Sequence, residues 1–201
     1  MSKTVDFIFD FACPTAYMTH TAIAGIKQRT GASFNASPCL LGGIFKSTGN
    51  QAPFVTFANV QGKQEYNKLE NERFLAKHNQ TAYKKNPHFP MSTVALMRGL
   101  IVAEEGGFKG PYTEAVLKAM WEDGENMADN DVAIRVLTAA GLEGAAIFEK
   151  TQDPDIKAKL IANTDAAVAR GVFGIPTFFV GEEMFFGKER LGQVEEEIMK
   201  G

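Results

Sequence analysis

The sequence of 201 residues predicts an α/β domain interrupted by a helical block, and three observations lead to this class. A strand, a helix and a second strand come first, and a long stretch with helical periodicity follows. A short strand pair and one more helix then close the chain. Because β-α-β units are nearly always right-handed with parallel strands, we expect the first two strands to be parallel neighbours.

The first elements are predicted from alternation and from helix boundary residues. Residues 5–11 place Val or Phe at every second position, which is typical of a strand with one apolar face. Pro14 opens a helix over 14–29, since a proline in the first turn lacks only an N–H that would have no partner there. Gly31 is placed to end this helix, and residues 34–41 predict the second strand.

The middle of the chain is predicted to be a loop followed by helices. Residues 42–57 are rich in Gly, Asn and Pro and predict a loop with at most one helical turn. Apolar residues then recur at helical spacing. The predicted helices are 63–79; 93–105, with Ser92 as its N-cap; one beginning at Pro111; one capped by Asp129 and ended by Gly141; and one opened by Asp153-Pro154 and ended by Gly171.

The C-terminal end returns to strand. Residues 177–180 and 184–186, joined by a turn, predict a β-hairpin, and 188–200 predict a closing helix. The expected organisation is therefore an α/β domain built from 1–42 and 172–201, with a mostly helical insertion over 43–171.

Composition excludes several classes of protein. The 21 basic and 24 acidic residues give a net charge of −3, which argues against a nucleic-acid partner. No stretch approaches the roughly 18 apolar residues of a membrane helix, and 5–11 lacks the pattern of a signal peptide, so we expect a cytoplasmic protein with no membrane partner. The two cysteines exclude a disulfide scaffold, and His20, His78 and His88 lack metal-ligand spacing, so we expect no metal site.

Two short motifs can carry chemistry. Cys13 stands between a strand end and a helix start, where helix N–H groups and the helix dipole favour a thiolate and can lower its pKa well below about 8.5. Pro176 directly precedes a strand, although only about 5–6% of X–Pro bonds in folded proteins are cis. Each motif also has a plain structural explanation: a buried inert cysteine, and a proline that marks a strand start.

These motifs belong to five segments that carry a family resemblance. The segments are 6–14 (DFIFDFACP), 41–50 (LGGIFKSTGN), 63–73 with Lys63, Tyr66, Glu70 and Arg73, 86–99 (NPHFPMSTVALMRG) and 171–191 (GVFGIPTFFV running to MFFGKERL). Together they resemble 2-hydroxychromene-2-carboxylate isomerases and kappa-class glutathione transferases. The resemblance implies a thioredoxin-like fold of the DsbA type with an all-helical insertion.

The resemblance also implies a glutathione site. Ile175, if its bond to Pro176 is cis, would pair its main chain with the cysteinyl unit of glutathione in strand-like fashion. Asn50 and Lys63 match positions that meet the carboxylate and the backbone of the ligand. Homodimers are implied by the resemblance alone.

The γ-glutamyl end of glutathione would be held by Lys188 and Glu189, where the family usually has a small polar residue and Asp. A second departure is Cys13, which replaces the serine that donates a hydrogen bond to the glutathione sulfur. A thiol is a weak donor, so Cys13 would do this less well, but it could exchange with a disulfide. Ala16 stands where disulfide oxidoreductases of this fold have their second cysteine. Cys39 is expected to be a core residue, although a bond to Cys13 would be possible within a Cα separation of roughly 7 Å.

The function expected first is a glutathione-dependent isomerase. Thiolate addition to a small conjugated aromatic acid, bond rotation and elimination would use Cys13 and an apolar cleft. The alternatives are a monothiol disulfide oxidoreductase or kappa-type transferase that uses Cys13, and a non-catalytic glutathione-binding protein. The candidates to line this cleft, most of which fit a plain core equally well, are Met18, Phe45, Phe54, Phe57, Met91 and Met97.

Overall fold

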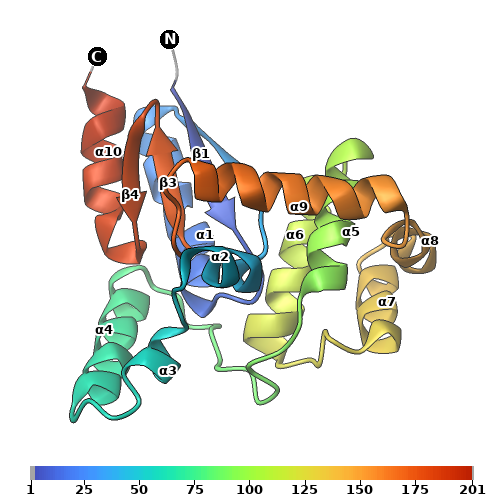
Figure 1. The fold of residues 1–201 in the computed structure, drawn as a ribbon, viewed down its shortest axis with the longest axis horizontal. Helices are drawn as coiled ribbons and strands as arrows, with labels where there is room; N and C mark the ends of the chain where they lie inside the picture. Colours follow the sequence, from blue (N-terminus) through green and yellow to red (C-terminus); the bar gives the residue numbers. More distant parts are fainter. Residues whose placement is uncertain (1–2, 201) are drawn as a thin grey trace.

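A four-stranded mixed sheet forms the centre of the computed structural model, which describes residues 3–200. Strand β1 (Thr4–Phe9) pairs in parallel with β2 (Ser33–Pro38) and antiparallel with β3 (Thr177–Val180), and β4 (Glu183–Phe186) completes the order β2-β1-β3-β4. The predicted parallel pair and hairpin are confirmed. The first strand therefore lies between its near neighbour in sequence and a strand from the far end of the chain (Figure 1).

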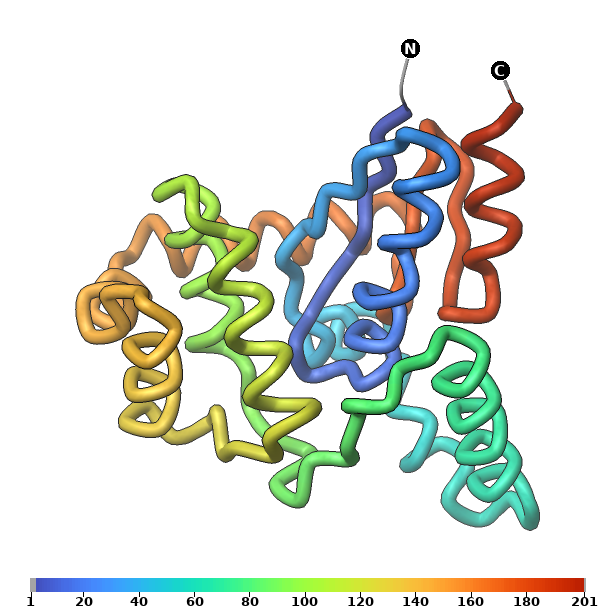
Figure 2. Tube along the Cα trace, turned by 180° about the vertical axis from the view of Figure 1, so that it is seen from behind, coloured from blue at the N-terminus to red at the C-terminus, as the bar shows by residue number. Residues whose placement is uncertain are grey.

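Helix α1 (Pro14–Thr30) follows β1 and covers one face of the sheet, while α9 (Pro154–Ala169) covers the other (Figures 1 and 2). Proline stands in the first turn of α1, and Gly31 ends the helix with φ 68° and an N–H bond to Lys27 O, as predicted. The last helix, α10 (Leu191–Met199), packs beside α1 and is preceded by the 3-10 turn η2 (Lys188–Arg190).

The core of the sheet is aromatic. Phe7 of β1 and Phe178 of β3 stack with ring centroids 5.0 Å apart, and Phe9 is also fully buried. The strand ends at Phe9, earlier than the alternation predicts. Ile8 and Asp10, whose positions alternate with those of Phe7 and Phe9, are buried as well. The reason is that β1 is an inner strand covered on both faces.

The middle of the chain is helical. Its remaining elements are α2 (Leu41–Thr48), α3 (Pro53–Thr56), α4 (Lys63–Lys77), α5 (Val94–Glu105), α6 (Lys109–Lys118), the π-helix η1 (Ala119–Asp123), α7 (Asn130–Ala139) and α8 (Gly144–Lys150). Asp129 and Asp153 accept backbone N–H groups as the predicted N-caps of α7 and α9. Helices α5 to α8 gather on one side of the molecule, and α3 and α4 lie apart from them, with α4 below α10 (Figure 1).

Two local predictions are wrong, and one helix was not predicted. Residues 42–57 contain helices α2 and α3 rather than a loop, and Gly43 serves close packing, since a Cβ there would lie 3.0 Å from Thr164 of α9. Thr93, not Ser92, is the N-cap residue of α5, because the chain enters the helix one residue later. Helix α8 had no predicted counterpart.

Candidate active site

Two segments 162 residues apart meet at the thiol of Cys13. This residue is the N-cap of α1, and its Sγ donates to Ile175 O at 3.2 Å and lies 3.1 Å from the Thr15 hydroxyl. The Ile175–Pro176 peptide bond is cis. The structure therefore places the two motifs that the sequence singled out directly against each other, below the end of the central strand.

The electrostatic state of Cys13 differs from the expectation. Burial raises the pKa of the thiol, and the carboxylate of Asp10 raises it further, whereas the Thr15 hydroxyl and the first helix N–H groups lower it by less. The prediction of a lowered pKa is wrong because the side chain is only 7% exposed and desolvation outweighs the helix terminus. At neutral pH the group is a thiol, which can donate a hydrogen bond.

Asp10 holds three elements together beside Cys13. Its Oδ1 accepts from Ala12 N at 2.9 Å and from the Thr93 hydroxyl at 2.6 Å, and its Oδ2 accepts from Leu41 N at 2.8 Å. The carboxylate thus ties the end of β1 to the starts of α2 and α5, and burial raises its pKa. Asp10 is not among the site residues predicted from the sequence. The available signal was a carboxylate at a strand end, three residues before the cysteine.

The segment before Pro176 leaves one backbone donor free. No hydrogen bond from Ile175 N–H to any of residues 3–200 is present, although the residue is buried. Orphaned buried N–H groups are rare in proteins, so this donor fits the main-chain carbonyl of an extended ligand. Asn50 supports the segment, since its Nδ2 donates to Phe173 O at 2.8 Å while its Oδ1 accepts from Gln51 N. Both of its polar groups are engaged, so Asn50 acts here as a brace.

The hairpin brings Lys188 and Glu189 next to the proline. Gly187 N donates to Pro176 O at 2.9 Å, and its φ of 96° is one that glycine adopts without strain. The Lys188 ammonium is buried, bonds to the Glu189 carboxylate and lies 5.4 Å from the centre of the Phe74 ring. Lys188 is thus used internally, between η2 and α4, whereas Glu189 is about half exposed.

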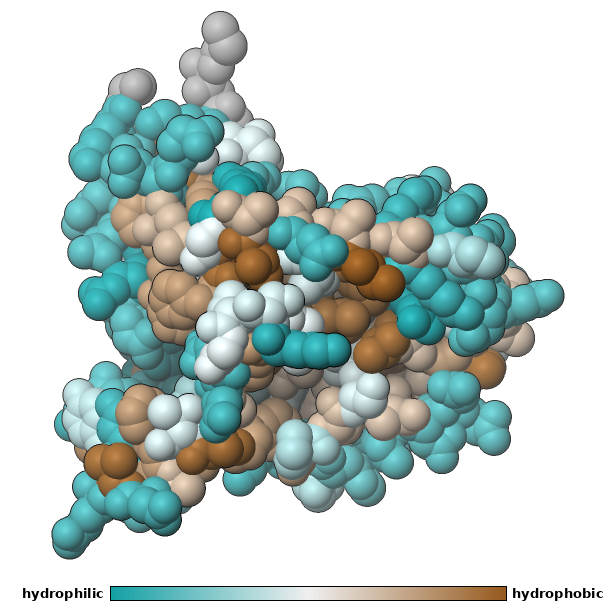
Figure 3. Space-filling model, viewed as in Figure 1, coloured by the Kyte–Doolittle hydropathy of each residue, from teal (hydrophilic) through white to brown (hydrophobic). Residues whose placement is uncertain are grey.

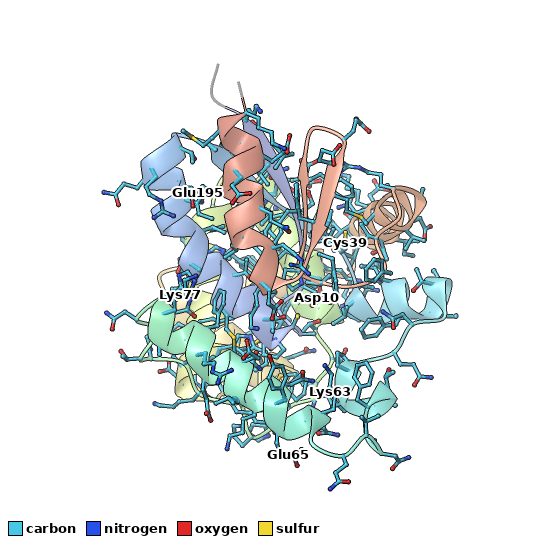
Figure 4. The ribbon with its side chains drawn as sticks, turned by 90° about the vertical axis from the view of Figure 1, so that its left-hand side faces the viewer. Asp10, Cys39, Lys63, Glu65, Lys77 and Glu195 are labelled. Atoms are coloured by element: carbon cyan, nitrogen blue, oxygen red, sulfur yellow. The ribbon has the colours of Figure 1, made fainter. Side chains whose placement is uncertain are left out.

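Lys63 occupies the first position of α4, the end of that helix turned towards α3 (Figure 4). Its Nζ lies 5.4 Å from the Phe57 ring and 5.9 Å from the Tyr66 ring, within the range of cation–π contact. Within residues 3–200, no ion pair to Lys63 is found, so its charge remains available to an anion. The same corner of the molecule carries exposed apolar side chains, as Figure 3 shows over α3 and the loop after it. They include Phe54, Val55 and Val60.

An aromatic row leads from α1 to this corner. It consists of Tyr17, Tyr83, Trp121, Phe89 and Phe54, whose successive ring centroids lie 5.6, 6.2, 5.9 and 5.7 Å apart. Trp121 is fully buried and donates its Nε1–H to Phe11 O at 3.1 Å, whereas Phe54 is 43% exposed. Its accessible rings, Phe54, Phe89 and Tyr83, can contact a planar aromatic molecule, while the buried Tyr17 and Trp121 support them from the core. Of the apolar residues expected to line a cleft, Met18 and Met97 are fully buried in the core instead.

The second cysteine does not join the site. Both cysteines are free, and Cys39 directs its Sγ to Asn163 O at 3.5 Å. Burial raises the pKa of Cys39 to about 12. Cavities of about 300 and 410 Å³ lie elsewhere. The first is lined by α5, the end of α8 and the start of α9, and the second by the loop before α4 and the first turn of α4. Across the described chain, no cluster of three metal-ligating side chains occurs.

A strand–helix junction with a thiol facing the residue before a cis-proline, on a mixed four-stranded sheet, defines a thioredoxin-like protein. The chain belongs to the DsbA-like thioredoxin domain family, whose model matches residues 4–199. No helix in the described residues is long and apolar enough to cross a membrane.

Curated relatives and solved structures agree with this assignment. The chain is 26% identical to a 2-hydroxychromene-2-carboxylate isomerase of Pseudomonas sp. (strain C18), covering 96% of this chain and 89% of the relative. It is 23% identical to the kappa 1 glutathione S-transferase of Rattus norvegicus, covering 94% and 88%. Similar relatives are thus isomerases and glutathione transferases.

Among solved structures, a 2-hydroxychromene-2-carboxylate isomerase matches with a TM-score of 0.82 at 23% identity, covering 96% of this chain and 93% of the other. The cytosolic disulfide reductase DsbM from Pseudomonas aeruginosa with GSH matches with a TM-score of 0.64 at 14% identity, covering 97% and 95%. At these identities the similarity establishes the DsbA-like fold.

Proposed function

We propose that this protein is a glutathione-dependent isomerase of small conjugated aromatic acids, of the 2-hydroxychromene-2-carboxylate type. The observation that carries the proposal is the pairing of the Cys13 thiol with the Ile175 main chain, 3.2 Å apart, beside the free Ile175 N–H. A donor at the helix start and a strand-like backbone edge are what a cysteine-containing peptide ligand requires.

The residues present fit glutathione at three points. The free Ile175 N–H can receive its cysteinyl carbonyl, the unpaired Lys63 can receive a carboxylate, and the half-exposed Glu189 can receive its ammonium. Lys188, which is buried and bonded to Glu189, orients that carboxylate rather than touching the ligand. Asn50 holds the loop before Ile175 in place.

When bound, glutathione supplies a thiolate that adds to the conjugated double bond, permits rotation about it and leaves unchanged. When the ligand is bound, Cys13 turns its S–H from Ile175 O to that sulfur, at the start of α1, where helix N–H groups favour negative charge. The accessible rings of the aromatic row, Phe54, Phe89 and Tyr83, hold the ring of the substrate and exclude water from one side. Proximity of the two reactants accounts for much of the expected rate gain.

The disulfide oxidoreductase alternative is weakened by three features of the site. Ala16 stands at the position of a resolving cysteine, Cys39 points to Asn163, and the Cys13 thiol is buried with a raised pKa. A thiolate is the attacking species in disulfide exchange, so a buried neutral thiol is a poor nucleophile.

The experiment is isomerisation of 2-hydroxychromene-2-carboxylate, followed by absorbance with and without added glutathione. We expect turnover that requires glutathione and leaves its concentration unchanged. Turnover without glutathione, or consumption of glutathione at the rate of product formation, would contradict the proposal.

Three further features accompany this proposal. We infer a thioredoxin-like domain of 1–42 and 172–201 with a helical insertion of 43–171, and a location in the cytoplasm. We also infer a homodimer, with the exposed apolar side chains over α3 as the surface available to a second copy. Light scattering at several protein concentrations tests the dimer.

A further inference from the structure

Tyr83 has a different environment from the other polar rings of the aromatic row. Tyr17 donates its hydroxyl to Glu122 at 3.0 Å, and Trp121 donates its indole N–H to Phe11 O. The Tyr83 hydroxyl makes no hydrogen bond to any residue between 3 and 200, although the residue is partly buried. The hydroxyl is not among the buried side-chain atoms that lack a partner, so it reaches the surface and is free to donate to a bound ligand.

The segment that carries Tyr83 is fixed against the thiol end of α1. Gln80 Nε2 donates to Met18 O at 2.6 Å, and Lys84 N donates to Trp121 O at 2.6 Å. Between these two attachments, the Tyr83 ring stacks on Trp121 with planes 19° apart and lies 5.6 Å from Tyr17. Tyr17 is one helical turn after Cys13, so its face of α1 is also that of the thiol.

The protonation state of Tyr83 suits a donor. Burial raises its pKa to about 12, and the nearby Cys13 adds to this effect. The phenol therefore keeps its proton at neutral pH and can give a hydrogen bond to a negatively charged oxygen. Neither ring packed against Tyr83 can accept this proton, because Tyr17 and Trp121 are themselves donors, to Glu122 and to Phe11 O.

We propose that Tyr83 is a catalytic residue that donates a hydrogen bond to the substrate oxygen that becomes negative when a thiolate adds to the conjugated double bond. This rests on the proposed isomerase function. In the addition, the C–S bond forms and the π electrons of the double bond move to the carbonyl oxygen, which the Tyr83 O–H stabilises. After rotation the same electrons return, the C–S bond breaks and Tyr83 retains its proton. No oxidant or reductant is needed.

The test compares Tyr83→Phe with Tyr112→Phe as the matched control, since Tyr112 is a buried tyrosine whose hydroxyl bonds to Leu96 O away from the site. Loss of one oxyanion donor typically lowers kcat by about 10²–10³-fold. We expect a fall of that size for Tyr83→Phe at nearly unchanged KM, and no such fall for Tyr112→Phe.

A second readout does not depend on turnover. With S-methylglutathione bound, 4-nitrophenolate serves as an oxyanion probe, and its binding is followed by visible absorbance. We expect about tenfold weaker binding of the anion by Tyr83→Phe than by the wild type and equal binding of neutral nitrobenzene. A Tyr83→Phe variant with wild-type kcat overturns the role of Tyr83 alone, as does unchanged affinity for the probe. Absence of wild-type isomerisation overturns the proposed function and this role together.

Discussion

Cys13 is the residue whose chemistry decides between addition and redox mechanisms. Burial and the Asp10 carboxylate both raise its pKa above the ordinary value of 9.0. Because the thiolate reacts, we expect alkylation by iodoacetamide to be slow at pH 7 and to rise only above pH 9. Intact-mass kinetics across pH, in a Cys39→Ser background, measure this. A rate that is already maximal by pH 8 would contradict a buried neutral thiol.

Replacing Cys13 by Ser tests whether the group serves as a donor. A hydroxyl is a better hydrogen-bond donor than a thiol, so the glutathione-dependent isomerase rate should be kept or raised. The measurement is kcat at saturating glutathione, with unfolding curves as a control for folding. Complete loss of activity in a folded variant would instead indicate covalent thiol chemistry.

Asp10 gives a stability prediction. In Asp10→Asn the amide NH₂ would face Leu41 N–H, leaving a buried donor without an acceptor, so we expect a loss of about 1–3 kcal/mol in the free energy of unfolding. Asp6→Asn is the control, because Asp6 forms an ion pair with Arg170 at the surface, worth less than about 1 kcal/mol. Urea unfolding compares the two variants. Equal losses would contradict a stabilising role for the buried hydrogen bonds of Asp10.

For individual residues, the sequence identified reactive side chains but not the residues that surround them. It selected Cys13 and Ile175, and the structure places them in contact. It left open whether Cys13 would be buried and did not predict the burial of Lys188, because spacing along a strand or helix does not show which residues a distant segment covers. Tyr83 and Asp10 were missed because their importance arises from contacts with residues distant in sequence.

The segment 80–93 between α4 and α5 is the element on which the aromatic row depends. Asn86 anchors it: the buried Nδ2 donates to Met120 O at 2.7 Å and to Glu125 O at 2.9 Å, and Oδ1 accepts from His88 N. Asn86→Ala leaves these groups without partners, so we expect a loss of about 2–3 kcal/mol in the free energy of unfolding. Thermal and urea unfolding measure it against Asn59→Ala, an exposed position.

A loss as small as that of Asn59→Ala would show that the segment is held by other contacts. We also expect Asn86→Ala to lower the isomerase rate, since Tyr83 and Phe89 belong to the same segment. If the variant is destabilised but its isomerase kinetics are unchanged, Asn86 stabilises the fold without positioning Tyr83 and Phe89.

Helices and strands with clear boundary residues were predicted well. Pro14, Asp129 and Asp153 mark helix starts. The two aspartates accept hydrogen bonds from unpaired N–H groups of the first turn, and Pro14 has no N–H that would need a partner. The helix at Leu41–Thr48 was missed because Gly42 and Gly43 indicate a turn locally, whereas Gly43 is needed for the approach of α9. Tertiary packing overrides local propensity at such positions.

At the scale of the whole molecule, the site is made by the sheet topology. Strand β1 pairs with β2 on one side and β3 on the other, so the residues following β1 and those preceding β3 meet at one place. The order of elements was predictable from the sequence, and so was the fold class. The positions of α4 and the aromatic row were not, because they depend on packing between helices that no local pattern encodes.

We infer that glutathione binds reversibly between Cys13 and the Ile175 main chain. Calorimetric titration with reduced glutathione, followed by intact-mass analysis of the same sample, tests it most directly. We expect saturable binding with one site per chain, an unchanged protein mass, and about 2.7 kcal/mol of added stability at a hundredfold excess over Kd. A mass gain of one glutathione on Cys13 that is lost with reductant, or an absence of binding heat and of stabilisation, would contradict it.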